Sequence, residues 1–120
     1  MLARPMLNPD LEAARKHHSA LKLILMRHVG SNADFRALRR VVDLCRVLSE
    51  ALEDEYCREK VGLVVEYAAE MLSHNEHHHR WGVDFLKRQI GDALELIESR
   101  VYSLQLLQSA PARPAALQFR

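Results

Sequence analysis

Apolar residues recur at helical spacing along most of this chain. The first predicted helix has Asn8 as its cap and Pro9 at its first position, and it ends at Gly30. Its apolar positions are Leu11, Ala14, Leu21, Leu25 and Val29, widened by Ala20 and Ile24. A stripe of this kind is a helix face that must be buried against another element.

A second apolar series follows the candidate caps Ser31 and Asp34. Its predicted stripe consists of Phe35, Leu38, Val42, Cys45, Leu48 and Leu52, widened by Val41, Leu44, Val47 and Ala51. We expect so wide a face on a helix that contacts more than one neighbour.

The apolar stripe thins after residue 52 and resumes at Val61, which leaves two interpretations open. Either the helix breaks within residues 54–60, or one helix runs from residue 33 to residue 74. At about 1.5 Å per residue the single helix would be roughly 60 Å long, and its neighbours in the chain could not easily cover it. We favour the break, which predicts four helices; the alternative predicts three with a long central helix.

The strongest periodic signal lies in the last predicted helix, which runs from Glu76 or His79 to Leu107. The segment Ser73-His74-Asn75-Glu76 has the spacing of a capping box before it. The stripe consists of Val83, Leu86, Ile90, Leu94, Ile97, Val101 and Leu104. Its repeat is close to 3.5 residues, which is typical of a bundle seam or a short coiled coil. We therefore expect an antiparallel helical bundle that forms a homodimer.

The prolines support an all-α fold because they occur only near the ends of the chain, at Pro5, Pro9, Pro111 and Pro114. A proline inside a helix costs about 3 kcal/mol, and a sheet needs turn residues at each reversal. A chain of 120 residues is expected to be one domain. We predict an N-terminal tail at 1–8, the bundle at 9–109 and a disordered C-terminal tail at 110–120.

The formal net charge is only +1, but the charges are divided into blocks. Arg36, Arg39 and Arg40 form a basic block, and an acidic block that includes Glu53, Glu55 and Glu59 follows it. Such blocks can order antiparallel helices within one chain or between two copies, or they can simply be solvated faces. We expect them at a partner surface. Nucleic-acid binding is not expected, because the chain lacks the strong basicity of such proteins.

A cluster of histidines between residues 74 and 79 is the one unusual local feature. Imidazoles bind zinc, copper and nickel, and helix neighbours three or four residues apart converge on one ion. The candidate ligands are His74, His77 and His78, with Glu70, His17 and His18 as further candidates. The alternative is an exposed helix junction that binds metal only adventitiously.

The sequence offers little for catalysis. Cys45 and Cys57 fall on or beside apolar faces, and the chain contains neither a Gly-x-Ser-x-Gly elbow nor a glycine-rich phosphate loop. No apolar run approaches the roughly 20 residues of a membrane span, and the N-terminus lacks a secretory signal pattern. Two cysteines are expected to be reduced thiols in a cytoplasmic protein.

These observations predict a small cytoplasmic interaction or regulatory module, an adaptor or chaperone-like protein rather than an enzyme. Its partners would be a second copy of the chain and an unidentified protein, with neither a membrane nor a cofactor involved. The alternative hypothesis is a transition-metal-binding protein that uses the histidine cluster.

Overall fold

A computed structural model describes residues 10–28, 32–74 and 82–109. These ranges contain four helices and no strand: α1 (Leu11–Arg27), α2 (Phe35–Leu52), α3 (Glu55–Leu72) and α4 (Val83–Ser109). The all-α prediction is confirmed, and so is the prediction of four helices. The predicted tails at 1–8 and 110–120 lie outside the described residues.

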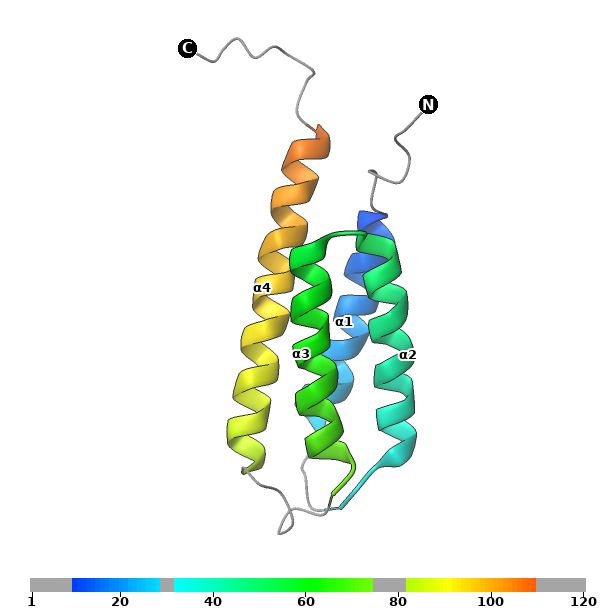
Figure 1. Cartoon of the computed structure of the whole chain (residues 1–120), viewed down its shortest axis with the longest axis vertical. Helices are drawn as coiled ribbons and strands as arrows, with labels where there is room; N and C mark the ends of the chain where they lie inside the picture. Colours follow the sequence, from blue (N-terminus) through cyan, green and yellow to red (C-terminus); the bar gives the residue numbers. More distant parts are fainter. Residues whose placement is uncertain (1–9, 29–31, 75–81, 110–120) are drawn as a thin grey trace.

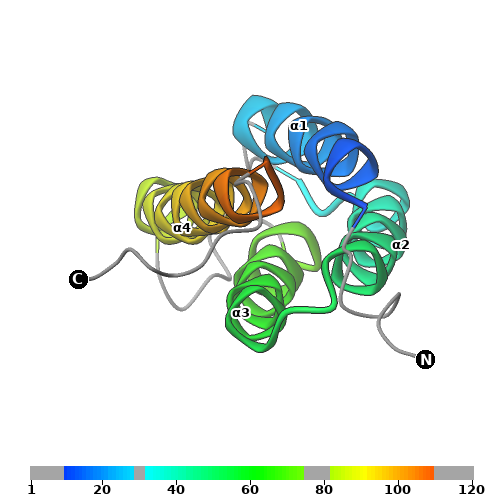
Figure 2. The same cartoon turned by 90° about the horizontal axis from the view of Figure 1, so that it is seen from above.

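The four helices alternate in direction and form an up-down-up-down bundle (Figure 1). Seen from above, they follow the chain order around a common centre (Figure 2). Each helix packs against the helices before and after it, and α1 also packs against α4 to close the ring. Within the described ranges no helix combines the length and the apolar character needed to cross a membrane.

Aspartates cap the first three helices. The side chains of Asp10, Asp34 and Asp54 each accept a hydrogen bond from the backbone N–H three residues later. Each bond satisfies a donor that the start of a helix leaves without an intrahelical partner. The predicted cap Asn8 is therefore wrong, because α1 begins at Leu11 with Asp10 as its cap.

The break between α2 and α3 lies at Glu53 and Asp54. Glu53 adopts the left-handed conformation, with φ of 49°, and its N–H donates to Ser49 O. This arrangement ends a helix by satisfying one of its last carbonyl groups. The predicted break is confirmed, and the single helix over residues 33–74 is excluded.

Three other predictions at helix ends are wrong. Ser73 was expected to open a capping box, but it is the C-cap of α3, where its hydroxyl donates to Ala69 O. The last helix begins at Val83, later than the expected start at Glu76 or His79, which lie outside the described residues. The first helix ends at Arg27 with His28 as its C-cap, before the predicted end at Gly30.

The core contains the predicted stripe of α4 from Val83 to Val101, all of it buried. The prediction that Phe35 and Val42 belong to the buried face of α2 is wrong, because their side chains are 63% and 43% exposed. Val41 and Leu44 are buried instead. The apolar arc of α2 is wider than α1 and α3 can cover, so part of it faces solvent.

Candidate functional site

The C-terminal end of α4 extends past the other helices. Helix α4 has 27 residues, whereas α1 has 17 and α2 and α3 have 18 each. At about 1.5 Å per residue it is roughly 13 Å longer than α3. Figure 1 shows this end rising beyond the start of α3 and the end of α2. We call residues 101–109 the α4 tip.

The α4 tip carries no charged side chain and exposes three large apolar ones. Tyr102, Leu106 and Leu107 are 62%, 54% and 69% exposed, whereas Val101, at the base of the tip, is buried in the core. Single exposed leucines are ordinary on a protein surface, but apolar side chains that gather on one surface often mark an interaction site. The tip is therefore the first candidate for a contact with another molecule.

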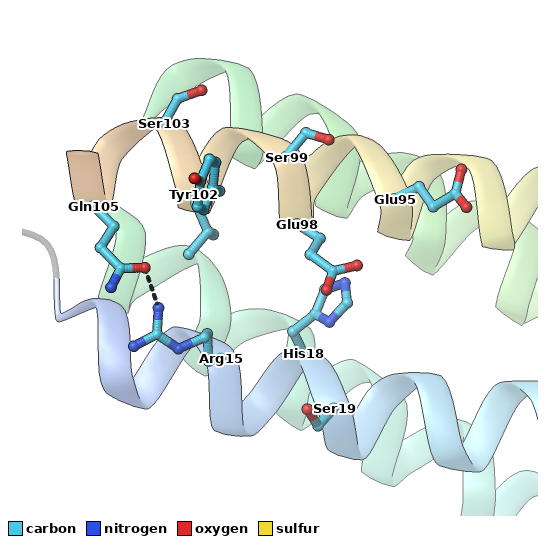
Figure 3. Close-up of a pocket in the computed structure, with 10 residues that line it drawn as sticks. Arg15, His18, Ser19, Glu95, Glu98, Ser99, Tyr102, Ser103 and Gln105 are labelled. Atoms are coloured by element: carbon cyan, nitrogen blue, oxygen red, sulfur yellow. Dashed lines mark hydrogen bonds between the residues drawn. The ribbon is translucent and has the colours of Figure 1, made fainter. Parts of the chain in front are cut away.

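A groove of about 700 Å³ lies between α1 and α4 and reaches the tip. Figure 3 shows Arg15 and His18 of α1 extending toward α4, where Glu98, Tyr102 and Gln105 lie opposite them. Nη1 of Arg15 donates a hydrogen bond to Oε1 of Gln105 at 2.7 Å, which joins the two walls beside the tip. Most of the residues that line the groove are polar, so it adds directional contacts to the apolar side chains next to it.

His18 contributes to the wall of this groove and is the only buried polar side chain in the described part of the chain. Its Nε2 lies 2.8 Å from the carbonyl oxygen of Leu94. A carbonyl oxygen only accepts, so Nε2 carries the hydrogen and donates it across the α1–α4 interface. The imidazole therefore links α1 and α4 near the middle of both helices.

The structure brings together only part of the predicted metal site. Glu70 and His74 lie one turn apart at the end of α3, where Nδ1 of His74 is 3.3 Å from the carbonyl oxygen of Glu70. His77 and His78 lie outside the described residues. Within the described ranges, no group of three or more histidine, cysteine, aspartate or glutamate side chains could hold a metal ion. The metal site stays a prediction from the sequence.

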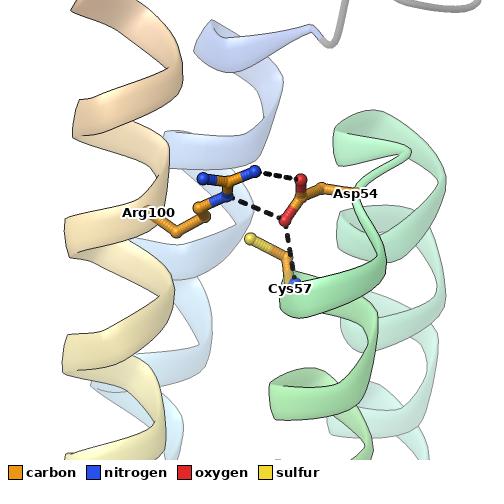
Figure 4. Close-up of polar contacts among 3 residues, drawn as sticks. All are labelled: Asp54, Cys57 and Arg100. Carbon is orange, nitrogen blue, oxygen red and sulfur yellow. Dashed lines mark hydrogen bonds and ion pairs between the residues drawn. The ribbon is translucent and has the colours of Figure 1, made fainter.

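The α4 tip is anchored by an ion pair that sequence reasoning missed. Arg100 donates from Nε to Oδ2 of Asp54 at 3.1 Å and from Nη2 to Oδ1 at 2.9 Å. The same carboxylate accepts from the N–H of Cys57 at 3.0 Å (Figure 4). The Asp54 side chain is only 13% exposed. The bidentate pair therefore fixes α4 to the start of α3 just before the tip begins.

The guanidinium of Arg100 lowers the pKa of Asp54 below its ordinary value, so this carboxylate is ionised at neutral pH. Burial raises the pKa of the Cys45 thiol to about 12, and burial together with the Asp54 carboxylate raises that of Cys57 to about 12. Thiolates are the reactive form of cysteine. Both thiols therefore stay protonated near neutral pH and are poor nucleophiles.

The two charge blocks do not meet within one chain. Arg36, Arg39 and Arg40 are exposed near the start of α2, whereas Glu55 and Glu59 are exposed near the start of α3. Because α2 and α3 run in opposite directions, these starts lie at opposite ends of the bundle (Figure 1). Both blocks therefore remain available for contacts with another molecule.

The comparisons with known proteins give no family and no relative from which a function could be transferred. The chain matches no protein-family model, no curated protein and no solved structure.

Proposed function

We propose that this protein is a small cytoplasmic interaction module, an adaptor or chaperone-like protein without chemistry of its own, and that it binds a protein partner through the α4 tip. The proposal rests on one observation: an uncharged helix end projects beyond the bundle and exposes Tyr102, Leu106 and Leu107. An apolar surface of this kind gains free energy when a partner removes it from water.

The chemistry of the surface suggests what the partner presents. Tyr102, Leu106 and Leu107 suit an apolar side of an amphipathic helix, which is a recurrent way for a segment to dock on a helical protein. Glu95 and Glu98 line the adjoining groove and are exposed. We expect the partner segment to carry a basic residue next to its apolar side, because opposite charges set orientation and discriminate against wrong partners.

The reduced thiols support the cytoplasmic part of the proposal. Cys45 and Cys57 are both free and buried. Free thiols are the usual state in a reducing compartment, where disulfides are rare. Their raised pKa values also support a role without covalent chemistry.

A photo-crosslinking residue at position 106 tests the proposal. We expect it to give an adduct with a discrete protein in cells, because Leu106 is at the centre of the proposed surface. Position 23 is the matched control, since Leu23 on α1 is as exposed as Leu106, at 54%, but lies on another helix. Equal adducts at both positions, or none at position 106, would contradict the proposal. Adducts of the chain with itself would instead assign the tip to a homodimer.

We also propose that the chain forms a homodimer. The sequence suggested that the repeat of α4 could be its seam, but that stripe is buried inside the bundle from Val83 to Val101. A homodimer therefore needs a different surface, and the exposed charges of α2 offer one.

A further inference from the structure

Helix α2 carries a stripe of five charged residues on its exposed side, and its C-cap Glu53 adds a sixth. In chain order they are Arg36, Arg39, Asp43, Arg46, Glu50 and Glu53. Their spacing alternates between three and four residues, which places the five residues within α2 on one side of that helix. A stripe with this average spacing of 3.5 residues stays in contact with a second helix that winds around it in a left-handed coil.

The order of these charges does not suit the helix that carries them. The first turn of α2 contains no acidic residue and its last turn no basic one. Arg36 and Arg39 lie toward its positive end and Glu50 and Glu53 toward its negative end, which is the reverse of what the helix dipole favours. An external contact would account for this order.

The order is self-complementary. When two copies of α2 lie antiparallel about a two-fold axis between residues 44 and 45, every charge in the stripe lies opposite a charge of the other sign. The pairs are Arg36 with Glu53, Arg39 with Glu50, and Asp43 with Arg46, each formed twice. A two-fold interface requires this match, because both copies contribute the same surface.

The charges are available for such a contact. Within the described ranges, Arg36 and Arg39 form no ion pair or hydrogen bond. Arg46 lies 3.9 Å from Asp43 and 3.6 Å from Glu50 on its own helix, with every side chain more than half exposed. Such exposed pairs contribute little to stability and can exchange partners.

Apolar side chains accompany the stripe. Phe35 and Val42 are the exposed residues that the bundle leaves without cover. Both lie on the same flank of the stripe, Val42 next to Asp43 and Phe35 next to Arg36, so in the antiparallel arrangement they would border the paired helices. These contacts would supply apolar burial next to the ion pairs.

We propose that the chain dimerises through antiparallel pairing of α2 with α2 of a second copy. This proposal rests on the proposed homodimer and names its surface. A single pair of helices makes a small interface, so we expect a dissociation constant in the micromolar range. Because ion pairs hold the two helices together, raising the salt concentration should weaken the dimer.

Charge reversal with mixing tests the proposal on the full chain. One variant carries Arg36→Glu and Arg39→Glu, and the other carries Glu50→Lys and Glu53→Lys. In each variant alone the reversed residues face like charges, so we expect dimerisation to weaken at least tenfold in sedimentation velocity at low salt. In an equimolar mixture every reversed residue again faces an opposite charge, so a heterodimer should form.

The matched control for the Glu50 and Glu53 variant is Glu66→Lys with Asp92→Lys, which makes the same change in net charge at exposed positions on α3 and α4 and should dimerise like the wild type. Circular dichroism at low protein concentration establishes that each variant is folded. We expect them to fold because the reversals move the charges of α2 toward the order that the helix dipole favours.

The outcomes separate the two proposals. Variants that stay dimeric, or a mixture that stays monomeric, would overturn the α2 surface while leaving the homodimer intact. A wild type that is monomeric at about 100 µM, well above a micromolar dissociation constant, would overturn both. If that monomer bound duplex DNA through the arginines, they would be an anion-binding surface instead. The crosslink at position 106 is independent of all these results.

Discussion

Replacing Ile90 with alanine should lower the free energy of unfolding by about 2–5 kcal/mol, the range found for large-to-small changes in well-packed cores. Ile90 is fully buried and lies in the middle of the α4 stripe. The substitution removes three buried carbons and leaves a cavity that the surrounding helices can fill only partly. Chemical denaturation monitored by circular dichroism measures the loss.

Leu96 provides the control on the same helix. Its side chain is 43% exposed, so Leu96→Ala should change the free energy of unfolding by about 0.5 kcal/mol or less. The loss in Ile90→Ala should also be independent of protein concentration, because the stripe packs within one chain. If the loss of unfolding free energy depended on protein concentration, it would contradict this structure. It would indicate that the α4 stripe packs between two copies of the chain.

Replacing Asp54 with alanine should cost about 2 kcal/mol at neutral pH. About 1 kcal/mol comes from the lost N-cap of α3, and a similar amount comes from the lost bond to Arg100, reduced because that arginine is partly exposed. Asp34→Ala is the matched control, since Asp34 caps α2 in the same way but forms no ion pair within the described ranges. It should cost about 1 kcal/mol. If both variants lost the same free energy of unfolding, the ion pair between Asp54 and Arg100 would contribute nothing to stability.

The contribution of Asp54 should also depend on pH. Arg100 lowers the pKa of Asp54 in the folded chain below its ordinary value of 3.8. A group whose pKa is lower when folded contributes its full stability above the unfolded pKa and loses it as the pH falls through the folded pKa. The difference in unfolding free energy between the wild type and Asp54→Asn should therefore be constant above about pH 5 and shrink below about pH 4. Asparagine keeps the cap, so this comparison isolates the charge.

The arrangement of helices could be predicted because it depends on local patterns. The absence of prolines from residues 10–110 and the apolar stripe of α4 each predict helix for their own part of the chain, without reference to the rest. The boundaries were less accurate, because Asn8, Asp10, Ser31 and Asp34 all make acceptable caps, and tertiary contacts select among them. The N–H of Asp10, for example, donates to Ala51 O on the adjacent α2. A contact of that kind leaves no mark in the local sequence.

The candidate site was harder to predict. The Asp54–Arg100 pair joins residues 46 positions apart, and nothing in either local sequence indicates the other. Tyr102, Leu106 and Leu107 belong to a helix that the sequence did predict, but their exposure follows from the shorter lengths of α1, α2 and α3. The charge order of α2 was visible as two blocks. Its self-complementary order could be interpreted only after the break at Glu53 had fixed where α2 ends.

The most direct test of the interaction-module proposal is the affinity of the partner captured at position 106. Its dissociation constant should be measured for the wild type, for Leu106→Ser with Leu107→Ser, and for Leu23→Ser. The double variant should bind at least tenfold more weakly, because two exposed leucines of the docking surface lose most of their apolar contact. Leu23→Ser should bind like the wild type. Equal affinity in all three proteins would contradict the assignment of the α4 tip as the docking surface.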